Sequence, residues 1–347
     1  MTHPLQFDRL LCLRTDYAYH ECNACETICP EGAFKVVRNR IELSKDACIS
    51  CGGCVGGCPT QALGLMGIEP ESIILRKVAA QSSRLSCREE GWCLALLSVE
   101  HWIALGLKVS APISCDLSEC HGCELDKAGH LQTAIISRLG EAEEFVTKAG
   151  LTWPITITRH QAEPSRRTLF RRLKEEAKEL ATTLPTLSPE HAKGQTLPLS
   201  RTLLKKSLQE RAEEINETIA MRTSFIAAKL IDPARCTNCR DCVNFCPAGA
   251  LFYDGTGTQI HFQIGKCIHC AICNAVCKEH AISEEDEIDL VALAFDRAKM
   301  LVAHRLETCS VCRTPFSQRG EETICPRCVS FHTEFPDMFK TAEELGL

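Results

Sequence analysis

Between residues 68 and 162, short apolar runs alternate with segments whose apolar side chains recur at helical spacing. The apolar runs lie at 84–87, 108–115 and 154–158. The clearest helical pattern is formed by Leu131, Ile135, Leu139, Ala142 and Val146. Alternation of strands and helices is typical of a small α/β domain with a parallel sheet. We therefore predict such a domain over residues 68–162.

Two charged segments follow this domain, at 165–181 and 201–220, and their mixed charges predict surface helices. Between them, residues 184–198 contain three prolines and one glycine with little apolar periodicity, which predicts a linker. We assign 163–227 to the charged helices and the linker, and we expect the linker to divide the chain into halves.

A further helix is predicted over 284–306, because four large apolar residues fall on one of its faces. These residues are Ile288, Val291, Phe295 and Val302. We assign 285–307 to a connecting helix and 308–347 to a separate C-terminal unit.

Cysteine changes this picture, because the chain has 25 cysteines among 347 residues and only 5% aromatic residues. Most cysteines lie two or three residues apart, and such neighbours converge on one metal or cluster more easily than they pair into separate disulfides. Thiolates persist in a reducing compartment, and the first eleven residues lack an export signal. We therefore expect a cytoplasmic protein.

Charge and hydropathy exclude two classes of partner. The formal net charge is −6, so no overall positive field would attract nucleic acid, and we expect no nucleic-acid partner. No stretch reaches about 18 uninterrupted apolar residues, so we expect no membrane span.

The strongest motif is a pair of cysteine runs between residues 236 and 277. They read Cys236-x2-Cys239-x2-Cys242-x3-Cys246-Pro247 and Cys267-x2-Cys270-x2-Cys273-x3-Cys277. In iron–sulfur ligand runs of this spacing, the fourth cysteine ligates the cluster of the other run. We therefore predict two [4Fe-4S] clusters. One takes Cys236, Cys239, Cys242 and Cys277, and the other takes Cys267, Cys270, Cys273 and Cys246.

A similar rhythm occupies residues 22–59 and predicts two more [4Fe-4S] clusters. One ligand set is complete and consists of Cys29, Cys48, Cys51 and Cys54. The other set contains Cys22, Cys25 and Cys58, but Tyr19 stands where the first cysteine of the run belongs. Cys12 is the main candidate for the fourth ligand, because a longer loop can bring an upstream thiolate to the cluster. His20 is the weaker substitute, and a three-iron cluster or an open iron is the remaining alternative.

Both halves of the chain resemble bacterial 2[4Fe-4S] ferredoxin domains, as found in polyferredoxin-type subunits of modular oxidoreductases. The resemblance covers residues 10–65 and 228–285. It implies a pseudo-twofold βαββαβ fold in each half, with short strands such as 229–231 and 259–262 flanking the ligand loops. We assign 1–67 and 228–284 to the two ferredoxin-like modules, so the fold class of the whole chain is α+β.

Four more cysteines near the C-terminus form two CxxC pairs separated by twelve residues. They are Cys309, Cys312, Cys325 and Cys328. Two such pairs across a short hairpin predict a tetrahedral four-sulfur site of the zinc-ribbon type, with rubredoxin-type iron as the rival metal. The metal would be structural, because about 30 residues bury too little core to fold alone.

Five cysteines remain once sixteen are assigned to clusters and four to the ribbon. They are Cys87, Cys93, Cys115, Cys120 and Cys123, all within the predicted α/β domain. Four of them could bind a further [2Fe-2S] or [4Fe-4S] cluster near the ends of strands, where such folds build sites. The alternative is buried or redox-active thiols.

Four clusters without a dinucleotide-binding, Walker A, HExxH or radical-SAM motif predict an electron carrier with no catalytic activity alone. Its partner would be an oxidoreductase, most naturally a multi-subunit one. Three alternatives stay open: a maturation factor for a metalloenzyme, a redox sensor that uses the ribbon to engage a regulator or nucleic acid, and an enzyme whose centre is the incompletely ligated cluster at Cys22, Cys25 and Cys58.

Overall fold

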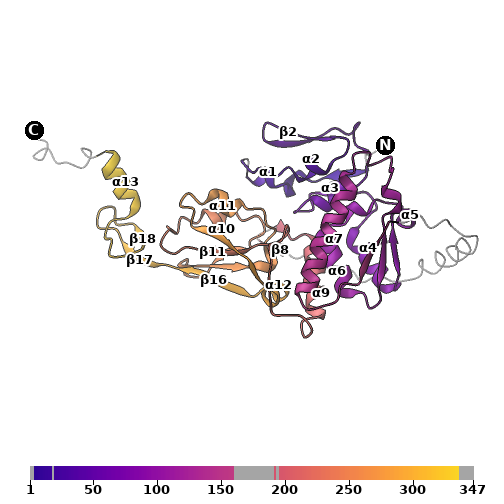
Figure 1. The fold of residues 1–347 in the computed structure, drawn as a ribbon. Helices are drawn as coiled ribbons and strands as arrows, with labels where there is room; N and C mark the ends of the chain where they lie inside the picture. Colours follow the sequence, from indigo (N-terminus) through magenta and orange to yellow (C-terminus); the bar gives the residue numbers. More distant parts are fainter. Residues whose placement is uncertain (1–3, 18, 160–190, 193–194, 336–347) are drawn as a thin grey trace, which may run out of the picture.

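The computed structural model describes residues 4–17, 19–159, 191–192 and 195–335. This part includes all 25 cysteines, and none of them forms a disulfide. Two small modules pack against a central parallel-sheet domain, and a hairpin with a short helix projects from the second module (Figure 1).

The N-terminal module begins with β1 (Leu5–Phe7) and ends with β4 (Leu63–Leu65), and these strands pair in antiparallel fashion. β2 and β3 form a hairpin whose turn residues, Arg38 and Asn39, both have positive φ, as tight two-residue hairpin turns require. The elements between β1 and β4 are η1 (Arg9–Leu11), α1 (Leu13–Asp16), α2 (Ala24–Ile28), β2 (Phe34–Val37), β3 (Arg40–Leu43) and α3 (Gly53–Gly57).

The second module has the same order of paired strands. Its first and last strands, β11 and β14, pair in antiparallel fashion, and β12 pairs with β13. The strands expected at 229–231 and 259–262 are both present. The elements are β11 (Ala228–Ile231), α10 (Asp241–Asn244), β12 (Leu251–Tyr253), β13 (Gln259–Gln263), η4 (Ile264–Lys266), α11 (Ile272–Val276) and β14 (Ile282–Glu285).

The parallel sheet expected within 68–162 is also present, and we call this part the sheet domain. Its strands lie in the order β5 (Arg84–Ser86), β6 (Ile113–Asp116), β7 (Ile155–Thr158). The longer helices are α4 (Pro70–Ala79), α6 (Val99–Lys108) and α7 (His130–Lys148). Trp102 of α6 and Phe145 of α7 are fully buried in the core. Three short helices lie between the strands: α5 (Cys87–Glu90), η2 (Leu94–Leu96) and η3 (Ser118–Cys120).

The surface helix expected at 201–220 is wrong in both extent and burial. The helix is α9 (Leu199–Glu210), and residues farther along form β10 (Thr218–Ala220), which pairs with β15 (Glu287–Asp289). The other charged helix, expected at 165–181, lies outside the described residues.

The charged side chains of α9 are buried because they form ion pairs with neighbouring elements. Arg201 is 1% exposed and pairs with Glu100 of α6. Lys205 is 2% exposed, and its Nζ lies 2.5 Å from Asp296 Oδ2. The mixed charges that indicated a solvated face therefore neutralise each other inside the molecule.

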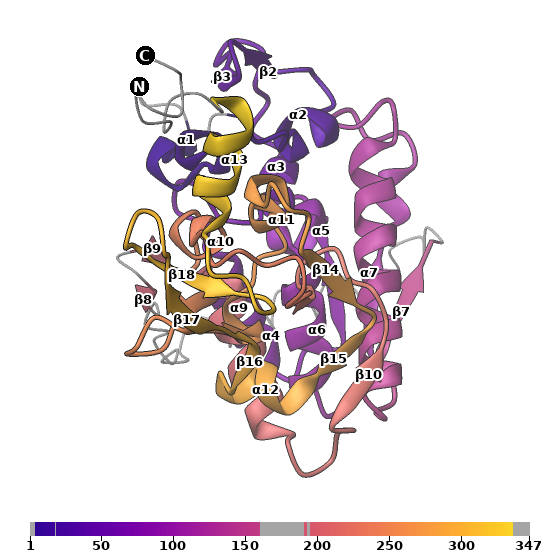
Figure 2. The same ribbon diagram turned by 90° about the vertical axis from the view of Figure 1, so that its left-hand side faces the viewer.

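The two halves of the chain share one core, so the separation expected from the linker at 184–198 is wrong. α9 follows this segment and packs between α6 of the sheet domain and α12 (Leu290–Phe295). Residues 184–190 lie outside the described part, and the short strands β8 (His191–Ala192) and β9 (Gln195–Thr196) pair within the segment. Both ribbon views show the second module against α9 (Figures 1 and 2).

The connecting helix expected over 285–307 is wrong for most of its length. Asp289 caps the start of α12 by accepting the Ala292 amide at 2.7 Å, and the helix ends at Asp296, which has a φ of 53°. The chain then forms β16 (Ala298–Ala303), which pairs with the free edge of β13. Pairing with a strand that is distant in sequence overrides the helical stripe.

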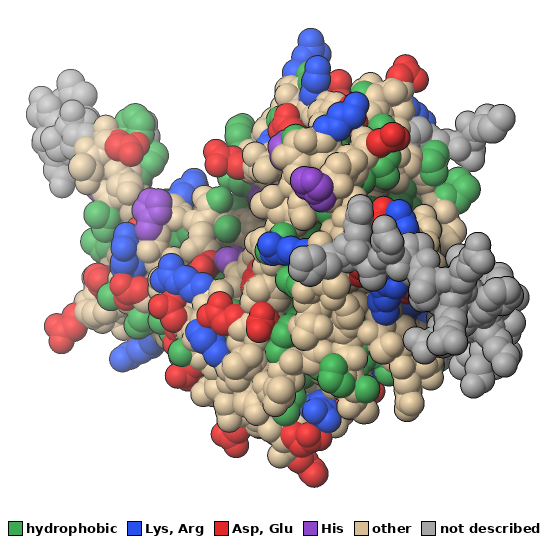
Figure 3. Space-filling model, turned by 45° about the vertical axis from the view of Figure 1, so that its right-hand side comes forward, with side chains coloured by type: hydrophobic (Ala, Val, Ile, Leu, Met, Phe, Trp, Pro, Cys, Tyr) green, Lys and Arg blue, Asp and Glu red, His purple; other side chains and the backbone are tan. Residues whose placement is uncertain are grey.

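The C-terminal unit consists of a hairpin of β17 (Arg305–Thr308) and β18 (Pro315–Gln318), followed by α13 (Pro326–Glu334). On the face drawn in Figure 3, basic and acidic side chains are interspersed. Within the described ranges, no helix is both long enough and apolar enough to cross a membrane.

Candidate metal centres

Four cysteines of the N-terminal module surround one hollow of about 370 Å³. Much of the remaining lining is apolar and includes Phe7, Leu13, Ile41 and Leu63. Four thiols around an apolar hollow form a donor set that a [4Fe-4S] cluster accepts, so these residues fit the cluster. We name this set site 2: Cys12, Cys22, Cys25 and Cys58.

The alternatives to Cys12 are engaged elsewhere. Tyr19 is 80% exposed, so its ring lies outside the hollow. His20 Nδ1 accepts the Cys22 amide at 2.9 Å, and His20 Nε2 lies 2.7 Å from the carbonyl oxygen of Cys270. Both nitrogens of His20 are therefore used by backbone groups, and it is Cys12 that the structure brings to the hollow.

Cys12 holds the same place relative to its strand as Cys236 does in the second module. Each lies five residues after the end of the first strand of its module. The next cysteine follows ten positions after Cys12 but only three positions after Cys236. The N-terminal module thus carries seven extra residues here, and α1 lies within them. Counting from the strand, rather than back from Cys22, finds this ligand in the sequence.

Site 1 is the other set of the N-terminal module and consists of Cys29, Cys48, Cys51 and Cys54. Burial raises the pKa of Cys54, and the thiolates of its three site partners and of Cys25 raise it further. Because Cys25 belongs to site 2, sites 1 and 2 are adjacent.

The second module brings together the two sets expected from its sequence. Site 3 surrounds a hollow of about 350 Å³ and consists of Cys246, Cys267, Cys270 and Cys273. Site 4 consists of Cys236, Cys239, Cys242 and Cys277. The pKa of Cys242 is raised to about 12 by burial and by thiolates that include Cys273 of site 3. Sites 3 and 4 are therefore adjacent as well.

Three of these sites share a backbone feature. In each, the amide four residues after the last cysteine of a run donates to that cysteine's sulfur, and such bonds stabilise a thiolate and tune a cluster's potential. The pairs are Ala33 to Cys29 at 3.3 Å, Ala250 to Cys246 at 3.2 Å and Ala281 to Cys277 at 3.3 Å.

Lys229 places a buried ammonium group beside site 3. It is 2% exposed, and its Nζ donates to Asn274 Oδ1 at 2.9 Å and to Glu284 Oε1 at 2.5 Å. Burial acts to lower the pKa of Lys229, but the thiolate of Cys273 and the carboxylate of Glu284 outweigh it, and the pKa is raised. The ammonium therefore stays charged.

The extra segment of the N-terminal module forms the contact with the second module. Leu13 packs with Ile268 and Ile272 in one apolar cluster, and the ring of Tyr17 meets that of Phe245 edge-on at 5.8 Å between centroids. His20 joins the amide of a site 2 cysteine to the carbonyl of a site 3 cysteine. Because Nδ1 accepts a hydrogen bond, Nε2 carries the proton and donates. Apart from the missing cysteine, nothing in the sequence pattern predicts this contact.

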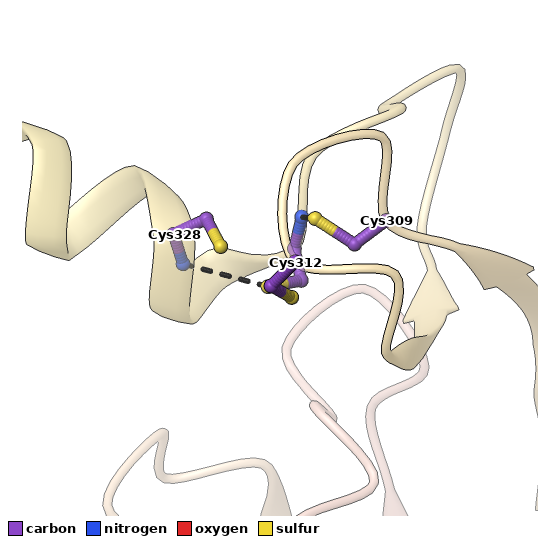
Figure 4. A group of neighbouring side chains, drawn as sticks. Cys309, Cys312 and Cys328 are labelled. Atoms are coloured by element: carbon purple, nitrogen blue, oxygen red, sulfur yellow. Dashed lines mark hydrogen bonds between the residues drawn. The ribbon is translucent and has the colours of Figure 1, made fainter. Parts of the chain in front are cut away.

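The C-terminal unit brings its four cysteines closest together. Cys309 and Cys312 lie between the strands of the hairpin, whereas Cys325 and Cys328 lie at the start of α13, and their sulfurs all lie within 4.8 Å of one another. Figure 4 shows Cys309, Cys312 and Cys328 pointing toward one another. A tetrahedral zinc ion holds sulfurs roughly 3.8 Å apart, so the set fits one zinc ion.

Backbone amides prepare this unit for a metal. The Cys325 amide donates to the Cys309 sulfur at 3.3 Å, and the Cys328 amide donates to the Cys325 sulfur at 3.4 Å. The hydrogen bond from Cys325 is the main reason that the pKa of Cys309 is lowered to about 6. A thiolate is the form that binds a metal.

The five remaining cysteines lie together near the carboxyl ends of β5 and β6. Cys115 is fully buried, and the other four are half-buried.

Two segments of the chain match family models described as 4Fe-4S dicluster domains, at residues 20–63 and 228–285. They coincide with the two modules that hold sites 1 to 4.

Curated relatives share short segments with this chain. The archaeal-type glutamate synthase (NADPH) of Thermotoga maritima is 34% identical over 64 residues, which are 18% of this chain and 13% of that protein. The beta chain of the NADH-dependent phenylglyoxylate dehydrogenase of Aromatoleum evansii is 38% identical over 68 residues, which are 19% and 15%. One component of the ion-translocating oxidoreductase complex of Methanosarcina acetivorans is 41% identical over 44 residues, which are 13% and 17%. The chain spans less than a fifth of the length of each.

Proposed function

We propose that this chain, an iron–sulfur protein with two 4Fe-4S dicluster domains, carries four [4Fe-4S] clusters and passes electrons between a low-potential donor or acceptor and a partner oxidoreductase. Each domain is proposed to be a ferredoxin-like βαββαβ module, which the order and pairing of its strands support. Sites 1 to 4 are the proposed ligand sets. Clusters bound there would supply one-electron chemistry.

The observation that carries this proposal is the arrangement of the four sites in one row. Sites 1 and 2 are neighbours within the N-terminal module, and sites 3 and 4 are neighbours within the second. His20 connects site 2 to site 3 through hydrogen bonds to the backbone of Cys22 and Cys270. Had the modules been separate, the protein would be two independent carriers.

The surroundings of the sites support carriage rather than chemistry on a substrate. Site 2 has four thiols around its hollow, so the proposal does not need an open iron that binds substrate. The partner is proposed to be a multi-subunit oxidoreductase, because two of the relatives are named as oxidoreductase subunits. A reducing cytoplasm suits a chain whose 25 cysteines form no disulfide.

The C-terminal unit is proposed to bind one structural Zn²⁺. Its sulfurs fit a single tetrahedral ion, and its small core needs a metal to fold. His304 lies where this unit joins the second module, since its Nδ1 lies 2.6 Å from Ser317 Oγ and its Nε2 lies 3.5 Å from the Cys236 sulfur. The unit thus lies beside site 4, where a partner protein could dock.

The test is metal and sulfide analysis of anaerobically purified protein, with EPR spectra during a reductive titration. We expect at least sixteen irons per chain, about four per cluster, and one zinc, with spin–spin interaction between reduced clusters of neighbouring sites. Abundant zinc with little iron would overturn the proposal. About eight irons, in two non-interacting centres, would reduce the row to two isolated carriers.

A further inference from the structure

Five cysteines outside the four sites and the C-terminal unit gather at one edge of the parallel sheet. Cys115 belongs to β6 and is the register partner of Leu85 in β5, and Cys87 directly follows β5. Cys120 and Cys123 follow β6 through η3. The carboxyl ends of adjacent parallel strands meet at the same edge, so the sheet itself brings these thiols together. Cys93 joins them from the residue before η2.

Local bonds fasten the two strand-end loops to each other. Arg88 Nη2 lies 2.8 Å from Glu119 Oε2, and these residues directly follow Cys87 and directly precede Cys120. The Cys120 amide donates to the Leu117 carbonyl at 3.1 Å. The ion pair therefore holds the backbones of Cys87 and Cys120 close to each other.

Cys87 and Cys120 lie at the centre of the group. The pKa of Cys120 is raised to about 11 by burial and by the thiolates of Cys87 and Cys123. The pKa values of Cys93 and Cys115 are each raised to about 12 by burial and by neighbouring thiolates, and in both cases these include Cys87 and Cys120. Each of the other three thiols thus has both central thiols as neighbours.

The group differs from a set of ordinary core thiols, which would each pack among apolar side chains. Four of its five members are half-buried, and they face one another. A single zinc ion fits less well, because in the described part of the chain only the C-terminal unit brings ligand atoms within 4.8 Å of one another. The wider spacing suits a cluster, in which each thiolate binds a different corner or edge.

We propose that these cysteines form a fifth iron–sulfur site, the middle site, held by Cys87, Cys120 and two of Cys93, Cys115 and Cys123. Four thiolates are the donor set of both [2Fe-2S] and [4Fe-4S] clusters. The inference goes beyond the four-cluster function, because no ligand of sites 1 to 4 belongs to the group.

The middle site lies next to site 1. Cys51 of site 1 is the foremost neighbouring thiolate of Cys93. Arg138 of α7 lies between the two sites: its Nη1 donates to the carbonyls of Ala95 at 2.6 Å and Leu97 at 3.0 Å, and its guanidinium faces the thiolates of Cys93 and Cys54. The middle site thus extends the row of sites at its site 1 end.

The experiment compares iron and sulfide content and ⁵⁷Fe Mössbauer spectra of the full chain and the double variant Cys87→Ala/Cys120→Ala, both purified without oxygen. We expect the variant to lose about two irons for a [2Fe-2S] cluster or about four for a [4Fe-4S] cluster. Ser118→Ala, in the same loop, is the matched control and should lose none. Unchanged iron in the double variant overturns the middle site.

The iron that the double variant keeps reports on sites 1 to 4, so failure of the middle site is distinguished from failure of the four-cluster proposal. A second measurement on the unmodified chain covers a variant that does not fold. Iodoacetamide should leave Cys87 and Cys120 unlabelled in the iron-loaded protein and should label both after a chelator removes the iron. Labelling of both in the iron-loaded protein would show free thiols and refute the site.

Discussion

The two dicluster domains differ at one equivalent pair of positions. Leu5 lies seven residues before Cys12, and its cross-strand partner is Leu65. Lys229 lies seven residues before Cys236, and its cross-strand partner is Glu284. The same place in the same strand pair therefore holds an apolar contact in the N-terminal module and a buried ion pair in the second.

This difference teaches that the repeated cysteine rhythm fixes the ligands but not the electrostatics around them. A buried ammonium group beside site 3 favours the reduced, more negative state of a cluster there, whereas two leucines supply no charge. We infer that site 3 has a higher potential than site 1. The modules would then have distinct places in the row rather than duplicate ones.

The largest expected effect tests whether Cys12 is the counterpart of Cys236. Replacing either by alanine (Cys12→Ala or Cys236→Ala) removes the first ligand of its module, so each variant should lose one cluster, or about four irons. Iron analysis and EPR measure the loss. A Cys12→Ala chain with full iron content and unchanged spectra would contradict the equivalence.

Tyr19 provides the control for this prediction. In the Cys12→Ala background, Tyr19→Cys restores the regular run of the sequence, but Tyr19 is 80% exposed and lies outside the hollow. We therefore expect no recovery of iron. Recovery would show that the regular spacing, rather than the strand-based position of Cys12, decides the ligand.

The next effect concerns how each module is fixed to the sheet domain by one buried arginine. Arg201 pairs with Glu100 and donates to the Cys267 carbonyl at 2.5 Å, so Arg201→Met leaves a buried carboxylate unpaired and should cost about 3–5 kcal/mol of unfolding free energy. Arg138 donates only to carbonyls of the η2 turn, so Arg138→Met should cost about 1–3 kcal/mol. Anaerobic denaturant unfolding measures both, and equal losses would remove this contrast between the modules.

A smaller effect tests the charge difference directly. Lys229→Met removes the ammonium group and should lower the potential of site 3 by roughly 50–100 mV, by Coulomb's law at a protein-like dielectric constant. The double variant Lys229→Met/Glu284→Leu reproduces the apolar pair of the N-terminal module and separates loss of charge from an unpaired carboxylate. Potentiometric titration followed by EPR is the measurement. An unshifted potential in both variants would sever the link between this pair and site 3.

The sequence predicts the molecule best where chemistry fixes spacing. The runs at 236–277 and 22–59 predict the cysteine sets that the structure brings together, because a cluster's thiolates must come from short, defined loops. Prediction fails where a distant partner decides the outcome. Arg201 and Lys205 are read as solvated until Glu100 and Asp296 are seen beside them, and β16 is read as helix until the free edge of β13 is seen. The grouping of the spare cysteines likewise depends on the sheet.

The smallest effect concerns the seven extra residues, which the second module lacks. His20→Ala removes one hydrogen bond to the Cys270 carbonyl and one from the Cys22 amide, so it should cost about 1 kcal/mol of stability while all four ligand sets stay intact. Iron content should be unchanged. If this histidine sets the contact between modules, the spin–spin interaction between sites 2 and 3 in the reduced protein should weaken, whereas that between sites 1 and 2 should not. Tyr19→Ala, a nearby exposed change, should alter neither interaction. Equal weakening at both places would mean that the substitution loosens the whole N-terminal module, and the contact would then owe its geometry to the packing of Leu13 and Tyr17 rather than to His20.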